Sequence, residues 1–195
     1  WESTPTVVSG SLAVNGPPLG MTAAGNATAI FAGSDASFSS EQSATKPAGG
    51  AWGAPTPIRE SNEISNDSVV LSVHQSGRMV ALWTESGPPR LRSSSRSAAT
   101  ASWDPPADVR GVPELPRCCG VAITPTGDVT LITAINGVIE AQRRVGDAGV
   151  WGPAATLASD YYNTVPIAGG DDAGNVLALW VRNGGQPTSD LVGST

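Results

Sequence analysis

Few side chains in this sequence are of the types that act as nucleophile, base or metal ligand. His74 is the only histidine, so a site built from several histidines is excluded. It follows the apolar run Val69–Val73, next to a Gln-Ser-Gly turn, where we expect a partly exposed side chain rather than a catalytic base. Asp171 and Asp172 lie in an oxygen-rich turn that could bind calcium. That turn lacks the ligand series of an EF-hand, and we expect no cofactor.

Cys118 and Cys119 are adjacent at the start of a predicted strand, so their side chains should point to opposite faces. Neighbouring Cα atoms are about 3.8 Å apart across a trans peptide, which is below the usual disulfide range of about 4.4–6.8 Å. We therefore expect two buried thiols. The alternative is a strained disulfide between the two neighbours that serves as a ligand platform or a redox switch.

A glycoside hydrolase for acidic sugars would need three arginines for a substrate carboxylate, a tyrosine activated by a glutamate, and a further acid. The chain has Tyr161, Tyr162 and many arginines, but no motif ties them together, and no pair of carboxylates marks a glycosidase. Arg90, Arg92 and Arg96 alternate with serines in a predicted strand, which places them on one solvated face. An anion site is the alternative for this cluster.

The composition favours an all-β chain. It contains 23 Gly, 16 Pro and only 14% charged residues, which suits short strands and tight turns. The net charge is −6 and Lys46 is the only lysine, so no basic surface is available for nucleic acid. No run of about eighteen apolar residues exists, so we expect no membrane span.

A repeat of about fifty residues organises these elements. Trp1, Trp52, Trp103 and Trp151 are spaced by 51, 51 and 48 residues, and a proline follows each within four positions. The repeats are 1–51, 52–102, 103–150 and 151–195. A sustained period of this length is typical of a repeat architecture, and we treat the four repeats as one domain.

A glycine 23 to 25 residues after each tryptophan opens a second motif, at Gly25, Gly77, Gly127 and Gly174. Glycine supplies the positive φ that a tight turn between two strands needs. The arm after the turn, as in Met79–Trp83, shows no polar alternation. We therefore expect this strand to be buried on both faces, as in a stack of sheets.

Two weaker strands complete each unit. The third is expected at 36–42, 90–96, 138–144 and 190–194 with one wet face, and the Trp-Pro segment begins the fourth. Four antiparallel strands per unit form a propeller blade, so we predict an all-β fold, a β-propeller of four four-stranded blades. A β-sandwich and a solenoid are the alternatives, but sandwiches lack such a period and the terminal repeats of a solenoid need polar caps.

The N-terminal strand is expected to close the ring. The missing fourth strand of the last unit is of the kind that Trp1 begins, so residues 4–9 would pair with residues 191–194 and leave no exposed strand edge. The alternative is that these blades belong to a larger propeller or assembly. The chain starts at Trp1 rather than at Met, as a processed or excised segment would.

The hairpin Gly174-Asn-Val-Leu-Ala-Leu-Trp180 and the corner Gly49-Gly-Ala-Trp-Gly-Ala-Pro55 resemble repeats of secreted bacterial propellers of the sialidase-like, Asp-box class. The Asp-box pattern is echoed by Asp147-Ala-Gly-Val-Trp151, one residue too short, and the other corners lack the aspartate. The resemblance covers the whole chain and implies an extracellular or cell-surface β-propeller. It implies no catalytic residues.

The longest connections join each fourth strand to the next unit, at 10–19, 61–68, 111–118 and 159–166, and should gather on one face of the ring. Functional residues of propellers lie on such loops. The candidate ligand-binding residues there are Asn62, Glu63, Asn66, Asp67, Glu114, Arg117, Asp160, Tyr161, Tyr162 and Asn163. Amide, acid and tyrosine groups suit a glycan or a protein partner; solvated loops without a ligand are the other reading.

From these features we predict a non-catalytic binding module of a secreted or surface protein. A sialidase-like glycoside hydrolase and a structural segment of a larger assembly are the alternatives, because a fold alone does not fix a function.

Overall fold

The computed structural model describes residues 18–34, 39–61, 69–85, 88–99, 101–111, 119–147, 149–159, 165–181 and 191–194. These residues form four antiparallel sheets. The first sheet contains β1 (Leu19–Met21), β2 (Ala27–Ser34), β3 (Ser39–Lys46) and β4 (Thr56–Ser61). The second contains β5 (Val70–Val73), β6 (Met79–Glu85), β7 (Arg90–Arg96) and β8 (Ala107–Gly111). The third contains β9 (Cys119–Ile123), β10 (Val129–Ile135), β11 (Val138–Arg144) and β12 (Ala155–Ala158), and the fourth contains β13 (Ile167–Gly170), β14 (Val176–Val181) and β15 (Leu191–Ser194).

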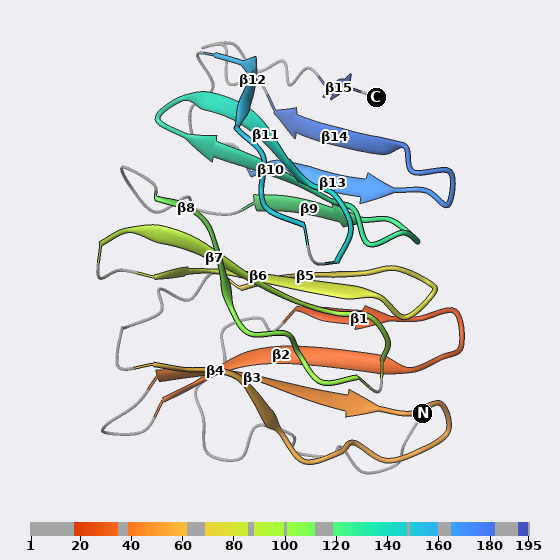
Figure 1. The fold of residues 1–195 in the computed structure, drawn as a ribbon. Coiled ribbons are helices and arrows are strands. Elements are labelled where there is room, and N and C mark those ends of the chain that lie inside the picture. The colour runs from red at the N-terminus through yellow and green to blue at the C-terminus, as the bar shows by residue number, and fades with distance from the viewer. Residues whose placement is uncertain are drawn as a thin grey trace.

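The sheets follow one another in chain order, as Figure 1 shows. Within each sheet the strands also pair in chain order, and the first strands contact one another: β1 contacts β5, β5 contacts β9, and β9 contacts β13. This is the arrangement of successive propeller blades around an axis lined by their first strands. The all-β prediction with blade-like sheets is confirmed. Closure is not detected among the described strands, and residues 4–9 lie outside the described residues.

The four predicted glycine turns are confirmed. Gly25, Gly77, Gly127 and Gly174 have φ values of 82°, 97°, 89° and 88°. In each turn the glycine N–H donates to the carbonyl oxygen three residues earlier, at 2.9 to 3.2 Å. A turn that ends in a left-handed residue matches the twist of the two strands it joins. We call the end of the sheets that carries these turns the hairpin end, and the opposite end the long-loop end.

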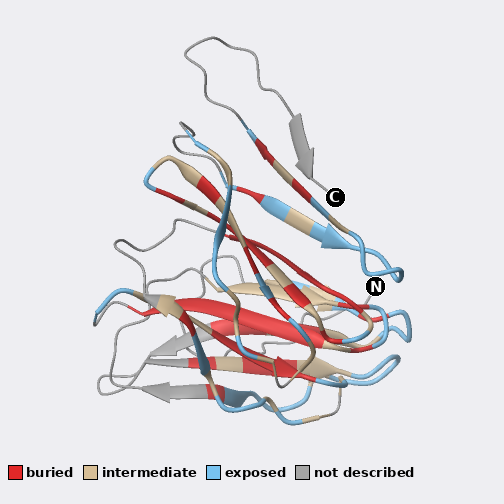
Figure 2. Cartoon of the chain, turned by 45° about the horizontal axis from the view of Figure 1, so that its top comes forward, coloured by how far each residue is buried: buried red, intermediate tan, exposed pale blue. Residues whose placement is uncertain are grey.

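The burial pattern agrees with the prediction for β6 and corrects it for β7. All seven residues of β6 are buried, as its unbroken apolar run predicts, and Figure 2 shows this strand inside the stack. The predicted wet face of β7 is wrong, because Ser93, Ser94 and Ser95 are buried and Arg96 is only 5% exposed. Small serines leave room at this surface for large side chains of a neighbouring sheet.

The strand bounds follow the prediction closely. Strands β7 and β11 have the predicted bounds, and β15 begins one residue later than expected. Strand β3 is displaced from the predicted 36–42, because it pairs with β2 along its whole length and reaches Lys46, opposite Ala27. The segments that follow Trp52, Trp103 and Trp151 enter β4, β8 and β12, which confirms the fourth strand.

An arginine and a tryptophan fasten the second sheet to the first. The guanidinium carbon of Arg96 lies 4.9 Å from the centre of the Trp103 ring. Arg96 Nη2 donates to Thr28 Oγ1 at 2.5 Å and to Thr45 Oγ1 at 3.1 Å. The indole Nε1 of Trp103 donates to Ser43 Oγ at 2.8 Å. We call this set an Arg–Trp clamp; burial lowers the pKa of Arg96 to about 10, so its charge persists at neutral pH.

A second Arg–Trp clamp fastens the third sheet to the second. Arg144 lies 5.7 Å from the Trp151 ring centre, and its Nη2 donates to Ser95 Oγ at 2.7 Å. Trp151 Nε1 donates to Ser93 Oγ at 3.1 Å. Trp103 and Trp151 therefore occupy equivalent positions, as their spacing predicts. Of the arginine cluster, Arg96 belongs to a clamp, and the side chains of Arg90 and Arg92 are 30% and 17% exposed, so the solvated-face prediction is wrong.

Gly120 allows the third and fourth sheets to approach closely. A Cβ atom at this position would lie 2.6 Å from the carbonyl carbon of Ile167 and 2.7 Å from the nitrogen of Ala168. Both are backbone atoms, which cannot rotate away. By contrast, a Cβ on Gly169 would meet nothing within 4 Å.

We expect Gly120→Ala to lower the melting temperature by roughly 4–8 °C, because overpacking of this kind costs about 2 kcal/mol. Gly169→Ala is the matched control and should leave the melting temperature unchanged or slightly raised. Thermal unfolding followed by circular dichroism measures both. Equal melting temperatures for the two variants would contradict the close approach.

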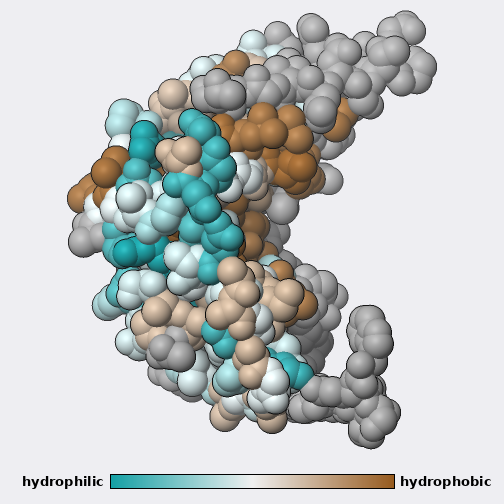
Figure 3. All heavy atoms as spheres, turned by 90° about the vertical axis from the view of Figure 1, so that its right-hand side faces the viewer, coloured by the Kyte–Doolittle hydropathy of each residue, from teal (hydrophilic) through white to brown (hydrophobic). Residues whose placement is uncertain are grey.

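The outer faces of the end sheets are apolar. In the fourth sheet Ile167, Leu177 and Val181 are 59%, 49% and 40% exposed, and in the first sheet Leu19 and Met21 are each 67% exposed. Figure 3 shows the molecule hollowed on one side, with apolar side chains on the wall formed by the fourth sheet. Among the described residues, no helix is long and apolar enough to cross a membrane.

Candidate functional site

The hairpin end carries four turns, each capped by the side chain of the residue that begins it. In three of them, the side chain that begins the turn accepts the backbone N–H four residues later: Asn26 N donates to Thr22 Oγ1, Asp128 N to Thr124 Oγ1, and Asn175 N to Asp171 Oδ1, at 2.8 to 3.2 Å. In the fourth, Ser76 N donates to His74 Nδ1 at 3.1 Å. Satisfying a turn N–H is the ordinary role of such residues.

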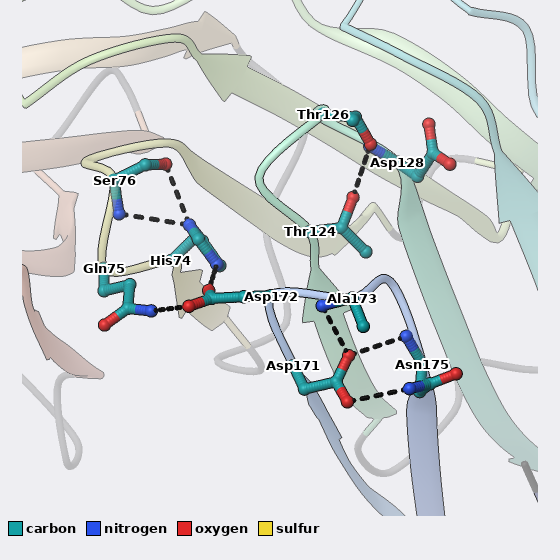
Figure 4. Close-up of polar contacts among 10 residues, drawn as sticks. All are labelled: His74, Gln75, Ser76, Thr124, Thr126, Asp128, Asp171, Asp172, Ala173 and Asn175. Atoms are coloured by element: carbon teal, nitrogen blue, oxygen red, sulfur yellow. Dashed lines mark hydrogen bonds and ion pairs between the residues drawn. The ribbon is translucent and has the colours of Figure 1, made fainter.

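His74 also joins two sheets that are not neighbours. Its Nε2 lies 3.0 Å from Asp172 Oδ1, and Gln75 Nε2 donates to the other oxygen of the same carboxylate. Figure 4 shows His74 and Gln75 reaching from the turn of the second sheet to the turn of the fourth, beside the Thr124–Thr126 turn of the third. His74 is only 7% exposed, so its predicted partial exposure is wrong. These turns occupy the hairpin end of the axis.

Ser76, His74 and Asp172 have the order of a nucleophile, a base and an acid. Ser76 Oγ lies 2.8 Å from His74 Nδ1, as a serine nucleophile would. The same Nδ1 already accepts the backbone N–H of Ser76, so its single lone pair is shared and is not available as a base for the hydroxyl. The arrangement is that of a capped turn rather than of an activated serine.

Asp171 uses its carboxylate to hold its own turn. Oδ2 accepts the Asn175 side-chain amide at 2.8 Å, and Oδ1 accepts the backbone N–H groups of Ala173 and Asn175. These hydrogen bonds, the Asn175 amide first, lower the pKa of Asp171. No group of three His, Cys, Asp or Glu residues that could hold a metal gathers within the described part of the chain.

Asp128 and Asp147, at the turn and the corner of the third sheet, form hydrogen bonds and ion pairs with neighbouring residues. Asp128 accepts the Gly146 N–H and an Arg143 guanidinium N–H, each at 2.7 Å, and these bonds lower its pKa. Asp147, the aspartate of the Asp-box echo, pairs with Arg78 of the second sheet. The aspartate of this Asp-box-like segment therefore contributes to the contact between the second and third sheets.

A groove of about 800 Å³ lies between the corners of the first and second sheets. Its lining includes Trp103, Arg96, Thr45, Pro57 and Asp104. Arg96 and the Trp103 N–H are engaged in the Arg–Trp clamp, so the groove offers mainly apolar surface with hydroxyl and backbone groups at its rim.

The second sheet carries a buried carboxylate, Glu85, at the long-loop end. Glu85 Oε2 accepts from Arg90 Nε at 2.5 Å and lies 3.7 Å from Arg92 Nη1, and Glu85 Oε1 accepts from Trp83 Nε1 at 3.3 Å. The Glu85 side chain is only 3% exposed. Counted from the turn glycine, the same position in the third sheet is Ile135.

A second polar set at this end joins the second and third sheets. Arg110 Nη2 donates to Thr133 Oγ1 and pairs with Glu140 Oε2, each at 2.8 Å. Side chains at the long-loop end thus differ from sheet to sheet, whereas the turns at the hairpin end repeat.

The ten predicted ligand-binding residues lie outside the described residues, and their role stays a prediction. They are Asn62, Glu63, Asn66, Asp67, Glu114, Arg117, Asp160, Tyr161, Tyr162 and Asn163. Cys118 also lies outside, while Cys119 is buried in the core between the second and third sheets. Sequence reasoning missed the Glu85 set, for which the only signal is that Glu85 and Arg90 stand at the two ends of one predicted hairpin.

Comparison with solved structures finds a similar fold in other proteins. A glycosyl hydrolase from Bacteroides ovatus is similar with a TM-score of 0.52 and 13% identity over 88% of this chain and 61% of its own. A putative glycosidase from Bacteroides thetaiotaomicron gives 0.51 and 12% over 88% and 62%. The polysaccharide lyase Uly1 gives 0.45 and 12% over 92% and 49%. The chain thus spans about three fifths of the two glycosidases. No family model and no curated protein match the sequence.

Proposed function

We propose that this chain is a non-catalytic glycan-binding module of a secreted or surface protein, and that the ligand binds at the long-loop end. The observation that carries the proposal is the contrast between the two ends of the sheets. Positions that serve the fold recur in every repeat, whereas positions that serve a ligand are free to differ.

The described turns at the hairpin end serve the fold. Its four glycine turns share the same hydrogen bonds, and the contacts of His74 and Gln75 with Asp172 occupy the axis at that end. Ligands of propellers enter where irregular loops surround the axis. This leaves the opposite end, with its long and dissimilar connections, for recognition.

Ion pairs at the long-loop end support this assignment. The Glu85 and Arg110 sets fix the strand ends from which the loops start, and rigid strand ends hold a binding loop in place. The fold is one that glycosidases share, which supports a glycan as the ligand class. A net charge of −6 repels uronic-acid polymers, so we expect a neutral polysaccharide.

Catalysis is less well supported by the described residues. A glycosidase presents two carboxylates to the bond that it cleaves. The oxygens of Glu85 are taken up by two guanidinium groups and an indole N–H, so this buried carboxylate faces protein groups rather than a substrate.

The Tyr161→Ala, Tyr162→Ala double variant is expected to weaken binding of neutral polysaccharide roughly tenfold or more, because aromatic side chains dominate such contacts. Its melting temperature should stay close to that of the parent, since loop side chains contribute little to the core. Affinity electrophoresis against a panel of neutral and uronic-acid polysaccharides measures the binding.

The matched control is Val150→Ala, at an 89% exposed position of the hairpin end, which should bind as the parent does. A folded double variant that binds as tightly as the parent would refute the long-loop assignment. Reducing ends released from a polysaccharide by the parent would show a glycosidase instead.

A further inference from the structure

A cavity of about 280 Å³ lies between the third and fourth sheets. Its walls include Ile132, Ala141 and Leu157 of the third sheet and Ala178 of the fourth. The corresponding place between the first and second sheets is filled by Trp103, which belongs to the Arg–Trp clamp.

The walls of this cavity are the repeat equivalents of the residues around Trp103. Trp103 packs on a cluster that contains Ile30, Ile58 and Ala81, and it donates to Ser43. Ile132 and Ile30 both lie five residues after a turn glycine, and Ala178 and Ala81 both lie four residues after a turn glycine. Leu157 and Ile58 both lie six residues after a corner tryptophan. Ala141 pairs with Ile132 on the neighbouring strand, and Ser43 pairs with Ile30 in the same way.

We propose that the cavity is the socket of a further corner tryptophan, and that its occupant is Trp1. Trp1 lies outside the described residues, whereas the corners of Trp52, Trp103 and Trp151 lead into β4, β8 and β12 of the first three sheets. Its corner would sit on the fourth sheet as the Trp103 corner sits on the second. The isoleucine, the leucine and the two alanines of the wall suit an apolar ring, because an uncovered apolar surface costs free energy in water. The rest of the lining includes the polar residues Thr124, Asp128 and Arg143.

The sequence after Trp1 fits the strand that must accompany it. Val7 is the sixth residue after Trp1, the position that Ile58, Val109 and Leu157 hold in β4, β8 and β12. Residues 11–18 separate Gly10 from β1, and segments of seven or eight residues separate β4 from β5, β8 from β9, and β12 from β13. The spacing is that of an outer strand belonging to the sheet before β1, and the fourth sheet is described with three strands.

The equivalence also fixes the register. Ser43 pairs with Thr56 and Ala141 with Ala155, and both partners lie four residues after a corner tryptophan. In the fourth sheet the position of Ser43 is taken by Gly193, the partner of Leu179. Pro5 should therefore lie opposite Gly193, and Thr6 opposite Val192.

The first test is a disulfide trap at this register. Thr6→Cys combined with Val192→Cys should form an intramolecular disulfide under mild oxidation, identified by peptide mass mapping so that Cys118 and Cys119 are distinguished. Ser9→Cys combined with Val192→Cys is the matched control and should not cross-link. Cross-linking only in the control pair, or in neither pair, would overturn the proposal.

The second test separates the socket from the strand. Trp1→Ala should lower the melting temperature by several degrees, and free indole should restore part of that loss by entering the vacated cavity. Val150→Ala should show neither effect. If positions 6 and 192 cross-link but Trp1→Ala leaves the melting temperature unchanged, the strand pairing stands and Trp1 is not the occupant of the cavity.

Discussion

Trp103→Ala is expected to lower the melting temperature by roughly 6–12 °C, because removing a partly buried indole costs about 3 kcal/mol. The indole packs on the cluster between the first and second sheets, covers the guanidinium group of Arg96 and donates to Ser43. Its loss uncovers a buried charge as well as apolar surface. Thermal unfolding followed by circular dichroism measures the effect.

Trp103→Phe separates the sources of this loss. Phenylalanine keeps an apolar ring but gives up the N–H, so we expect a loss of about 1 kcal/mol from the hydrogen bond. Trp151→Ala should behave like Trp103→Ala, because Trp151 makes the same contacts one sheet later. If the phenylalanine and alanine variants were equally unstable, packing would not be the main contribution of the clamp.

Glu85→Ala is expected to cost about 3 kcal/mol, because it removes one partner of a buried ion pair. Glu85 pairs with Arg90 at 2.5 Å and lies near Arg92 at 3.7 Å. Urea unfolding measures the free energy directly. The loss should persist in high salt, since buried pairs are screened much less than exposed ones.

Asp108→Ala is the control for Glu85→Ala, because it removes the other carboxylate bound to Arg92. Asp108 lies 3.1 Å from Arg92 but its side chain is 66% exposed, and exposed pairs contribute about 0–1 kcal/mol. Comparable losses for the two variants would mean that burial does not distinguish the two pairs.

The fold could be predicted from the sequence because its signals are local. A positive φ favours glycine, so the four turns were visible without any tertiary information, and each turn fixes the register of its two strands. The corner tryptophans set the period, and the period identified the sheets. Residues 36–42 were misplaced because the first repeat carries no strong apolar signal in its third strand.

The environment of the charged residues could not be predicted in the same way. The pattern around Arg96 shows serines and arginines, which is also what an exposed strand shows. Whether such a strand is exposed to solvent depends on which large side chain covers it, and here Trp103 lies against Arg96. The contact of His74 with Asp172 joins residues 98 positions apart, so it depends on how the turns meet at the axis.

The Arg–Trp clamps also give synthesis of the chain a direction. Each clamp reaches backward, so the third strand of a sheet is covered only after the corner of the following sheet has been made. Ser43 gains its hydrogen bond only after Trp103 has been synthesised, and Ser93 gains its hydrogen bond only after Trp151 has been synthesised. At elongation rates of about 5–20 residues per second, a gap of about fifty to sixty residues corresponds to roughly 3–12 s. During that interval the newest sheet on the ribosome presents an uncovered apolar face.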